Sequence, residues 1–358
     1  MNNSSLDISY ARIKDLIPNW FWNVIYIIRF LDLSNNEIKG RLPQHLKFQA
    51  KEDGLGIFLS SNRFEGPVAY FPPNVYALDL SNNSFSGTIP SDLGNFGGKR
   101  PWLTFLSFSS NNLVGSIPDS LCHLVDLVSL ELSNNHLDGV IPNCWNNLTA
   151  LQYLILANNS LVSEIPNLFR SSSQSLKVLH LSNNQLHGEF PSFSKECTSI
   201  TTLALDHNNL FGEFPSWEGE TMTSLMILTL KENNFSGEFP SNIGLMQSLE
   251  SLDLSSNELI GSIPPSLCTL NFLGSLNLSY NNLFGKIPYA GHLTTFNDPS
   301  IYTNNPNLCG APLGKHCTSF EPPSNRHDQE DDDDNDDSPS IWFYIGLMPG
   351  FVVGFWTV

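Results

Sequence analysis

One small group of residues in this sequence has side chains that could do nucleophilic or acid–base chemistry. His180, Ser182, Asp206 and His207 stand at matching places in two neighbouring copies of a repeated phrase. A serine nucleophile needs a histidine base, oriented in turn by a carboxylate. We expect these four side chains on an open strand surface without a water-excluding pocket, and the sequence contains no HExxH, GxSxG or Walker phrase. It therefore predicts a binding protein without cofactor or metal, and no enzyme.

The phrase that positions these residues has ten letters and returns along most of the chain. It reads LDLSNNSFSG from Leu78, LELSNNHLDG from Leu130 and LDLSSNELIG from Leu252. Its sixth residue is Asn at positions 36, 62, 83, 111, 135, 159, 184, 208, 233, 257 and 281, and a degenerate copy begins at Leu6. A period of 24 to 25 residues from position 111 onward indicates a solenoid of stacked coils.

The letters of the phrase predict which side chains point inward. In LxL the two leucines face one way along an extended strand and the residue between them faces solvent. Leu252, Leu254, Leu259 and Ile263 should form one layer of a shared core. The sixth-position Asn should bond backbone groups of its own and the adjacent coil, and the tenth-position Gly should occupy a tight turn. The apolar stretch WFWNVIYIIRFLDL is interpreted as repeat core.

Charge excludes one class of partner. The formal net charge is −18, and eight of the carboxylates lie between Asp328 and Asp337. The remainder of the chain stays near −10. A nucleic-acid backbone would be repelled, so we expect no nucleic-acid partner.

The variant LxLSxNxLxGxIP, which runs from Leu6 to Pro288 in about twelve coils, resembles the extracellular leucine-rich repeats of plant receptors. The resemblance implies an α/β leucine-rich-repeat solenoid, a curved right-handed superhelix with a parallel β-sheet on its concave face. The block NNPNLCGAPLGKHC resembles the C-terminal cap of those ectodomains, in which Cys309 and Cys317 would form a disulfide. Such a bond implies an oxidising compartment.

The sequence contains no Gly-rich loop, HRD or DFG phrase of a kinase, and its acidic stretch followed by the apolar segment WFYIGLMPGFVVGFW resembles kinase-less plant receptor-like proteins. We expect an N-terminal remnant without signal peptide over 1–5, repeats over 6–288, a cap over 289–320, an acidic spacer over 321–340 and a single transmembrane helix over 341–358. The last segment barely reaches the roughly 17 to 25 residues that span a bilayer. The sequence is therefore interpreted as cut at both ends.

The resemblance implies a single-pass type I protein of the plasma membrane with extracellular repeats. Such proteins bind an extracellular ligand of peptide, microbial or cell-wall origin, and signal in defence or development through an adaptor receptor-like kinase and a co-receptor kinase. Two alternatives stay open: a secreted inhibitor of microbial cell-wall hydrolases, and a non-functional receptor gene fragment.

Ligand contacts are expected where outward strand residues depart from the consensus of Asp, Asn and Ser. These candidates are Tyr153, Ile155, Val178, His180, Asp206, His207, Thr229, Lys231 and Glu232. Neutral drift on a solvated face is the competing interpretation. In the family that the chain resembles, a co-receptor docks on the last coils before the cap, which implies Asp253, Ser255, Ser256, Asn277, Ser279 and Tyr280.

Three further sets of residues carry predictions. Glycosylation sequons occur at Asn82, Asn147, Asn158, Asn234 and Asn277, of which the first, third and fifth should lie on the concave side. Cys122 and Cys144, 22 residues apart in adjacent coils, either form a disulfide on the convex side or stay reduced, whereas Cys197 and Cys268 are interpreted as buried hydrophobes.

The apolar C-terminal segment contains a doubled small-residue motif. Gly346, Gly350 and Gly354 would form one ridge of a helix, along which a partner helix can pack closely. The family resemblance links this ridge to pairing with the adaptor kinase.

Overall fold

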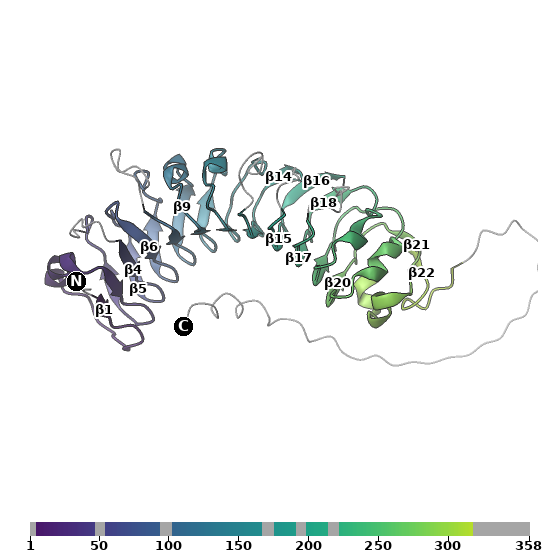
Figure 1. Ribbon diagram of the computed structural model, residues 1–358, viewed down its shortest axis with the longest axis horizontal. Helices are drawn as coiled ribbons and strands as arrows, with labels where there is room; N and C mark the ends of the chain where they lie inside the picture. Colours follow the sequence, from purple (N-terminus) through teal and green to yellow (C-terminus); the bar gives the residue numbers. More distant parts are fainter. Residues whose placement is uncertain are drawn as a thin grey trace, which may run out of the picture. The chain divides into compact units, whose positions relative to one another are not determined.

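Residues 5–46, 54–93, 102–166, 175–190, 198–213 and 222–317 are described by the computed structural model, and they belong to one compact unit, Met1–Cys317. Within this unit each coil adds one parallel strand to a sheet of twelve, in chain order, along the inner side of the stack (Figure 1). The strands are β1 Ser5–Asp7, β2 Phe30–Asp32, β4 Leu55–Phe58, β6 Val75–Asp79, β8 Phe105–Ser107, β10 Ser129–Glu131, β12 Tyr153–Ile155, β13 Val178–His180, β15 Thr202–Ala204, β17 Ile227–Thr229, β19 Ser251–Asp253 and β20 Ser275–Asn277.

A second set of short parallel strands follows the turn after each main strand. One sheet contains β3 Lys39–Arg41, β5 Arg63–Gly66, β7 Ser84–Gly87, β9 Asn112–Ser116 and β11 His136–Asp138. A second contains β14 His187–Glu189, β16 Asn209–Glu213 and β18 Asn234–Ser236, and a third pairs β21 Phe284–Lys286 with β22 Asn307–Cys309. We refer to the surface of these strands as the lateral face.

The return side of several coils contains a short 3-10 turn. In the described part of the chain the helical elements are α1 Asn19–Val24, η1 Ile25–Ile27, η2 Asp119–His123, η3 Trp145–Asn147, η4 Ile243–Leu245, η5 Pro265–Thr269, η6 Gly291–Thr295 and η7 Pro299–Tyr302. The predicted α/β class therefore overstates the helix content, because a coil of about 24 residues with two strands leaves room for only one tight turn.

Among the described helices, none is long and apolar enough to cross a membrane. The predicted span over 341–358 lies outside the described residues.

The core follows the predicted alternation. Leu252, Leu254, Leu259 and Ile263 are all buried and belong to one hydrophobic cluster that continues from coil to coil. Near the N-terminus Trp22 and Ile25 join the same cluster, whereas Trp20, Val24, Tyr26 and Ile27 of the same stretch are exposed. The interpretation of this apolar stretch as repeat core is therefore only partly correct. Because each coil buries its leucines only against its neighbours, the stability of the stack is shared between adjacent coils.

The sixth-position asparagines form the predicted ladder. The Asn135 side-chain amide donates to the carbonyl oxygens of Phe108, in the preceding coil, and Leu132, at 2.9 and 3.1 Å. Its side-chain oxygen accepts from the backbone N–H of Leu113, also in the preceding coil, at 3.0 Å. One amide thus satisfies backbone groups of two coils that would otherwise be buried without a partner.

The fifth residue of each phrase adopts a left-handed backbone, which the alternation rule did not predict. Its φ is 55° at Asn134, 56° at Asn158, 54° at His207 and 52° at Glu232. The chain therefore leaves the extended conformation before this residue. His207 and Glu232 were expected on the concave strands, but they lie in the turn that follows them, as do Ser256 and Tyr280 of the expected co-receptor surface. Asparagine tolerates this conformation well, whereas larger side chains do so at a cost.

The described residues form one disulfide between adjacent coils and one within the segment after the last coil. Cys122 in η2 pairs with Cys144 at the start of η3, and Cys309 pairs with Cys317 in the segment after the last coil. The spacing of Cys122 and Cys144 had left open whether they are bonded or reduced, and the structure shows them bonded. The Cys309–Cys317 bond is the one that the family resemblance implied. Cys268 is free and packs against the core, partly buried. Cys197 lies outside the described residues.

Candidate binding surface

The strand register aligns the predicted ligand contacts in rows across the concave sheet. Tyr153 stands opposite Val178, and Ile155 stands opposite His180. His180 faces Ala204 in the next strand, which in turn faces Thr229. Tyr153 is 36% exposed, and the others in these rows, apart from the buried Ala204, are half-buried. Apolar and polar groups from four adjacent coils therefore share one surface.

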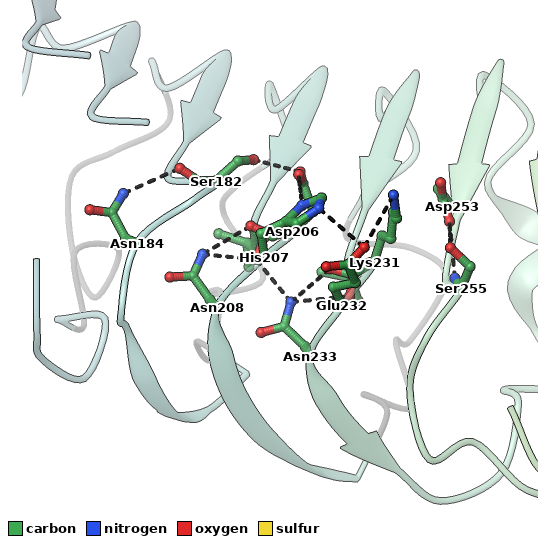
Figure 2. A network of polar contacts seen from close by, with 12 residues as sticks. Ser182, Asn184, Asp206, His207, Asn208, Lys231, Glu232, Asn233, Asp253 and Ser255 are labelled. Carbon is green, nitrogen blue, oxygen red and sulfur yellow. Dashed lines mark hydrogen bonds and ion pairs between the residues drawn. The ribbon is translucent and has the colours of Figure 1, made fainter. Parts of the chain in front are cut away.

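Polar residues beside these rows form a connected network, which we call the ionic cluster: Ser182, Asp206, His207, Lys231 and Glu232 (Figure 2). The Ser182 hydroxyl donates to Oδ1 of Asp206 at 2.5 Å, and Nδ1 of His207 lies 2.9 Å from Oδ2 of the same carboxylate. Nε2 of His207 lies 3.2 Å from Oε1 of Glu232, and Nζ of Lys231 lies 3.3 Å from that oxygen. The network joins three coils.

The order of contacts in the ionic cluster does not match that of a catalytic triad. Asp206 lies between Ser182 and His207, so the hydroxyl contacts the carboxylate and not the imidazole base. A serine nucleophile requires the opposite order, with the base beside the hydroxyl. Ser182 is also only 2% exposed, which corrects the expectation that it lies on the open surface. The same geometry suits a fixed pattern of charges and donors on a binding face.

His180 sits beside the ionic cluster in a less polar environment. Its burial lowers its pKa below the ordinary histidine value, and the neighbouring Asp206 carboxylate raises it by a smaller amount. A neutral imidazole here presents one donor and one acceptor to the concave side.

Glu131, which was not among the predicted site residues, stands where most other coils have Asp, Asn or a small residue. Its carboxylate accepts hydrogen bonds from Ser107 at 3.3 Å and Ser129 at 3.2 Å. Burial raises the pKa of Glu131, and Asp79 adds to the rise, while the hydrogen bonds from Ser129 and Ser107 lower it. The longer side chain in LELSNN was the available signal.

The predicted co-receptor residues differ in burial, and Asp253, Ser256 and Asn277 are half-buried. Ser255 and Ser279 are only 2% and 6% exposed, so they cannot provide the surface contacts expected of them. Their hydroxyls donate to Asp253 and Asn277 at 2.6 and 2.8 Å, which fixes those side chains at the strand ends. Tyr280, by contrast, is 56% exposed.

The sequons lie on three sides of the coils. Asn82 and Asn158 are exposed in left-handed turns beside the concave sheet, and not on its strands as expected. Asn147 is exposed in η3, and Asn234 is exposed on the lateral strand β18. Asn277 is half-buried in β20. Occupancy of all five sequons stays a prediction.

The glycines 346, 350 and 354, which were predicted to form a ridge for pairing with a partner helix, lie outside the described residues.

Comparison with known families agrees with this architecture. The pattern described as Leucine Rich Repeat matches residues 28–48, 74–96, 102–124, 126–148, 150–172 and 248–270, and a two-copy pattern matches 174–219. These matches together cover more than half of the chain. The chain belongs to the leucine-rich-repeat proteins.

Sequence relatives of the chain show which kind of leucine-rich-repeat protein it resembles. Receptor-like protein EIX2 of Solanum lycopersicum is 37% identical over 129 residues, which are 36% of this chain and 12% of that protein. Receptor-like protein 32 of Arabidopsis thaliana is 36% identical over 124 residues, 33% of this chain and 14% of that protein. The relatives of this chain are thus plant receptor-like proteins, and the aligned part is a small share of their length.

Solved structures show the same fold. The Arabidopsis receptor kinase HAESA, in complex with the peptide hormone IDA and the co-receptor SERK1, superposes with a TM-score of 0.75 at 32% identity, over 87% of this chain and 51% of that one. A plant ice-binding protein superposes with a TM-score of 0.56 at 28% identity, over 82% and 85%. These two proteins have different functions, so the shared fold does not by itself indicate a function for this chain. That inference has to come from its surface residues.

Proposed function

We propose that the repeat stack is the ligand-binding part of a kinase-less plant cell-surface receptor. The ligand is extracellular, of peptide, microbial or cell-wall origin, and it contacts the concave surface from Tyr153 to Glu232. Partner receptor kinases, an adaptor bound through the segment at 341–358 and a co-receptor near Tyr280, supply the signalling step in defence or development.

The contacts within the ionic cluster are the observation that most directly supports this proposal. Side chains on the outer face of a strand or turn are not needed for the leucine core, yet four of them form a network with the buried Ser182 over three coils. Two members, His207 and Glu232, occupy left-handed positions that most other coils fill with Asn or Ser. A residue kept in a costly conformation is a reasonable indicator of function. The receptor names of the relatives, and the peptide hormone and co-receptor bound to HAESA, support the same role.

The test is a binding screen followed by surface variants. The full chain is immobilised and screened against a synthetic library of extracellular plant peptides and a panel of cell-wall oligosaccharides. Tyr153→Ala, His180→Ala and Lys231→Ala should each weaken the binding of a recovered ligand by about 5-fold or more, as contacts near the centre of an interface do. Asp32→Asn, on the same face in β2, serves as the matched control and should leave binding unchanged.

The secreted-inhibitor alternative makes a different prediction in the same assay. A microbial cell-wall hydrolase, and not a peptide or oligosaccharide, would then bind the chain and lose activity. Equal ligand binding by wild type and all three surface variants would contradict the proposal that the ligand contacts the concave surface.

A further inference from the structure

Successive left-handed residues contact one another along the stack. The side-chain amide of Asn158 donates to the side-chain oxygen of Asn134 at 2.9 Å, and Asn82 donates to the hydroxyl of Ser61 at 3.2 Å. These contacts join neighbouring coils through neutral groups. Their strength does not change with pH, because neither amides nor hydroxyls titrate between pH 5 and 8.

His207 and Glu232 form the corresponding contact, but from two ionisable side chains. Nε2 of His207 faces Glu232 at 3.2 Å, while Nδ1 faces Asp206 at 2.9 Å. Carboxylates only accept hydrogen bonds, so both ring nitrogens must donate if both contacts are to hold. A neutral imidazole has one N–H and can donate to one carboxylate only. The observed bridge is therefore complete only with an imidazolium ring.

The other charged groups that face His207 are the carboxylates of Asp206 and Glu232, and the Lys231 ammonium contacts Glu232. His180 lies near Asp206 from the preceding coil, and its burial lowers the pKa of that ring, which favours its neutral form. Protonation of His207 changes the formal charge of Asp206, His207, Lys231 and Glu232 together from −1 to zero.

We infer that His207 is a pH-dependent cross-link that sets the charge and shape of the ligand surface. In acid, the imidazolium ring holds Asp206 and Glu232 and joins two coils across the ionic cluster. Towards neutral pH, one carboxylate is released and the surface gains a negative charge. Its relevance to signalling rests on the proposed function, because the same residues are the proposed ligand contacts.

The cross-link can be tested without any ligand, so its failure is distinct from failure of the proposed function. Thermal midpoints of the full chain are measured from about pH 5 to pH 8 for wild type, His207→Asn, Glu232→Asn and the double variant. Asn is the residue that several other coils carry at this position, so each variant should fold. His136→Asn, at an exposed site on β11, is the matched control.

The cross-link predicts that His207→Asn lowers the midpoint more at pH 5 than at pH 8, and that this pH dependence disappears when Glu232 is already Asn. The control should show no such coupling to Glu232. A double-mutant coupling that is the same at both pH values, or absent at both, would overturn the inference.

Discussion

Asn135 donates a hydrogen bond of 2.9 Å to the carbonyl oxygen of Phe108, a residue 27 positions earlier in the chain. This contact joins one coil to the preceding one through a buried amide, and the equivalent contact recurs along the stack, as at Asn208 with Leu181. The regularity of the fold therefore depends on a polar ladder as well as on leucine packing.

Replacing Asn135 with Ala should lower the free energy of unfolding by about 2–4 kcal/mol, because it leaves backbone groups of Phe108, Leu132 and Leu113 buried without a partner. Chemical denaturation of the full chain measures the loss. Asn134→Ser is the matched control, because other coils carry Ser at that exposed position, and it should change stability by less than about 0.5 kcal/mol. Similar losses at the two positions would refute the ladder's role.

Close packing of the 3-10 turns predicts a strong difference between two glycines. A Cβ at Gly244 in η4 would lie 2.5 Å from the carbonyl oxygen of Ser266, whereas a Cβ at Gly274 would meet nothing nearer than 3.8 Å. Gly244→Ala should therefore destabilise the protein by about 1–3 kcal/mol, as overpacking does. Gly274→Ala, the control, should be neutral or slightly stabilising. Thermal unfolding of the two variants distinguishes the outcomes, and equal midpoints would contradict the close contact between η4 and η5.

The Glu131 carboxylate should make stability depend on pH. Burial raises its pKa above the ordinary value of 4.5, so the folded state binds a proton more tightly than the unfolded state. The stability that follows is fully present below about pH 4.5 and is lost as the pH rises through the folded-state pKa. Glu131→Gln should thus be more stable than wild type at pH 7, with a difference that shrinks on acidification. A difference that stays constant from pH 4 to 7 would argue against a buried carboxylate.

The Cys122–Cys144 disulfide should stabilise the middle of the stack. It closes a loop between residues 22 positions apart in adjacent coils, so its removal by a double Cys→Ala change should cost about 3 kcal/mol. Denaturation with and without reductant measures this, and Cys268→Ala, which removes a free thiol, is the control. If the double variant and the reduced wild type match the oxidised wild type in stability, the bond contributes nothing.

The repeat fold could be predicted from the sequence because its signals recur in nearly every coil. Leucine alternation and the sixth-position Asn predicted the strands, the core and the ladder, and the spacing of Cys122 and Cys144 placed them within reach of each other. Helix content was overestimated because the return segment of each coil has no repeated signature that separates a helix from a 3-10 turn.

The details of the binding surface were harder to predict. The alternation rule placed His207 and Glu232 on concave strands, yet the chain turns left-handed at these positions. The recurrent Asn or Ser at the fifth place of the phrase was the signal for that turn. Burial of Ser182, Ser255 and Ser279 depends on neighbouring coils, whose spacing the sequence does not give. The pairing of His207 with both Asp206 and Glu232 likewise depends on how closely neighbouring coils stack.

The central claim, that the concave surface around the ionic cluster binds the ligand, is tested most directly by hydroxyl-radical footprinting. The probe is the first library peptide that binds the full chain, and side-chain oxidation is read by mass spectrometry. The account predicts that oxidation of Tyr153 and His207 falls on binding, while the exposed Tyr26 and Tyr289 are unchanged. Binding that leaves Tyr153 and His207 as reactive as in the free protein would contradict it.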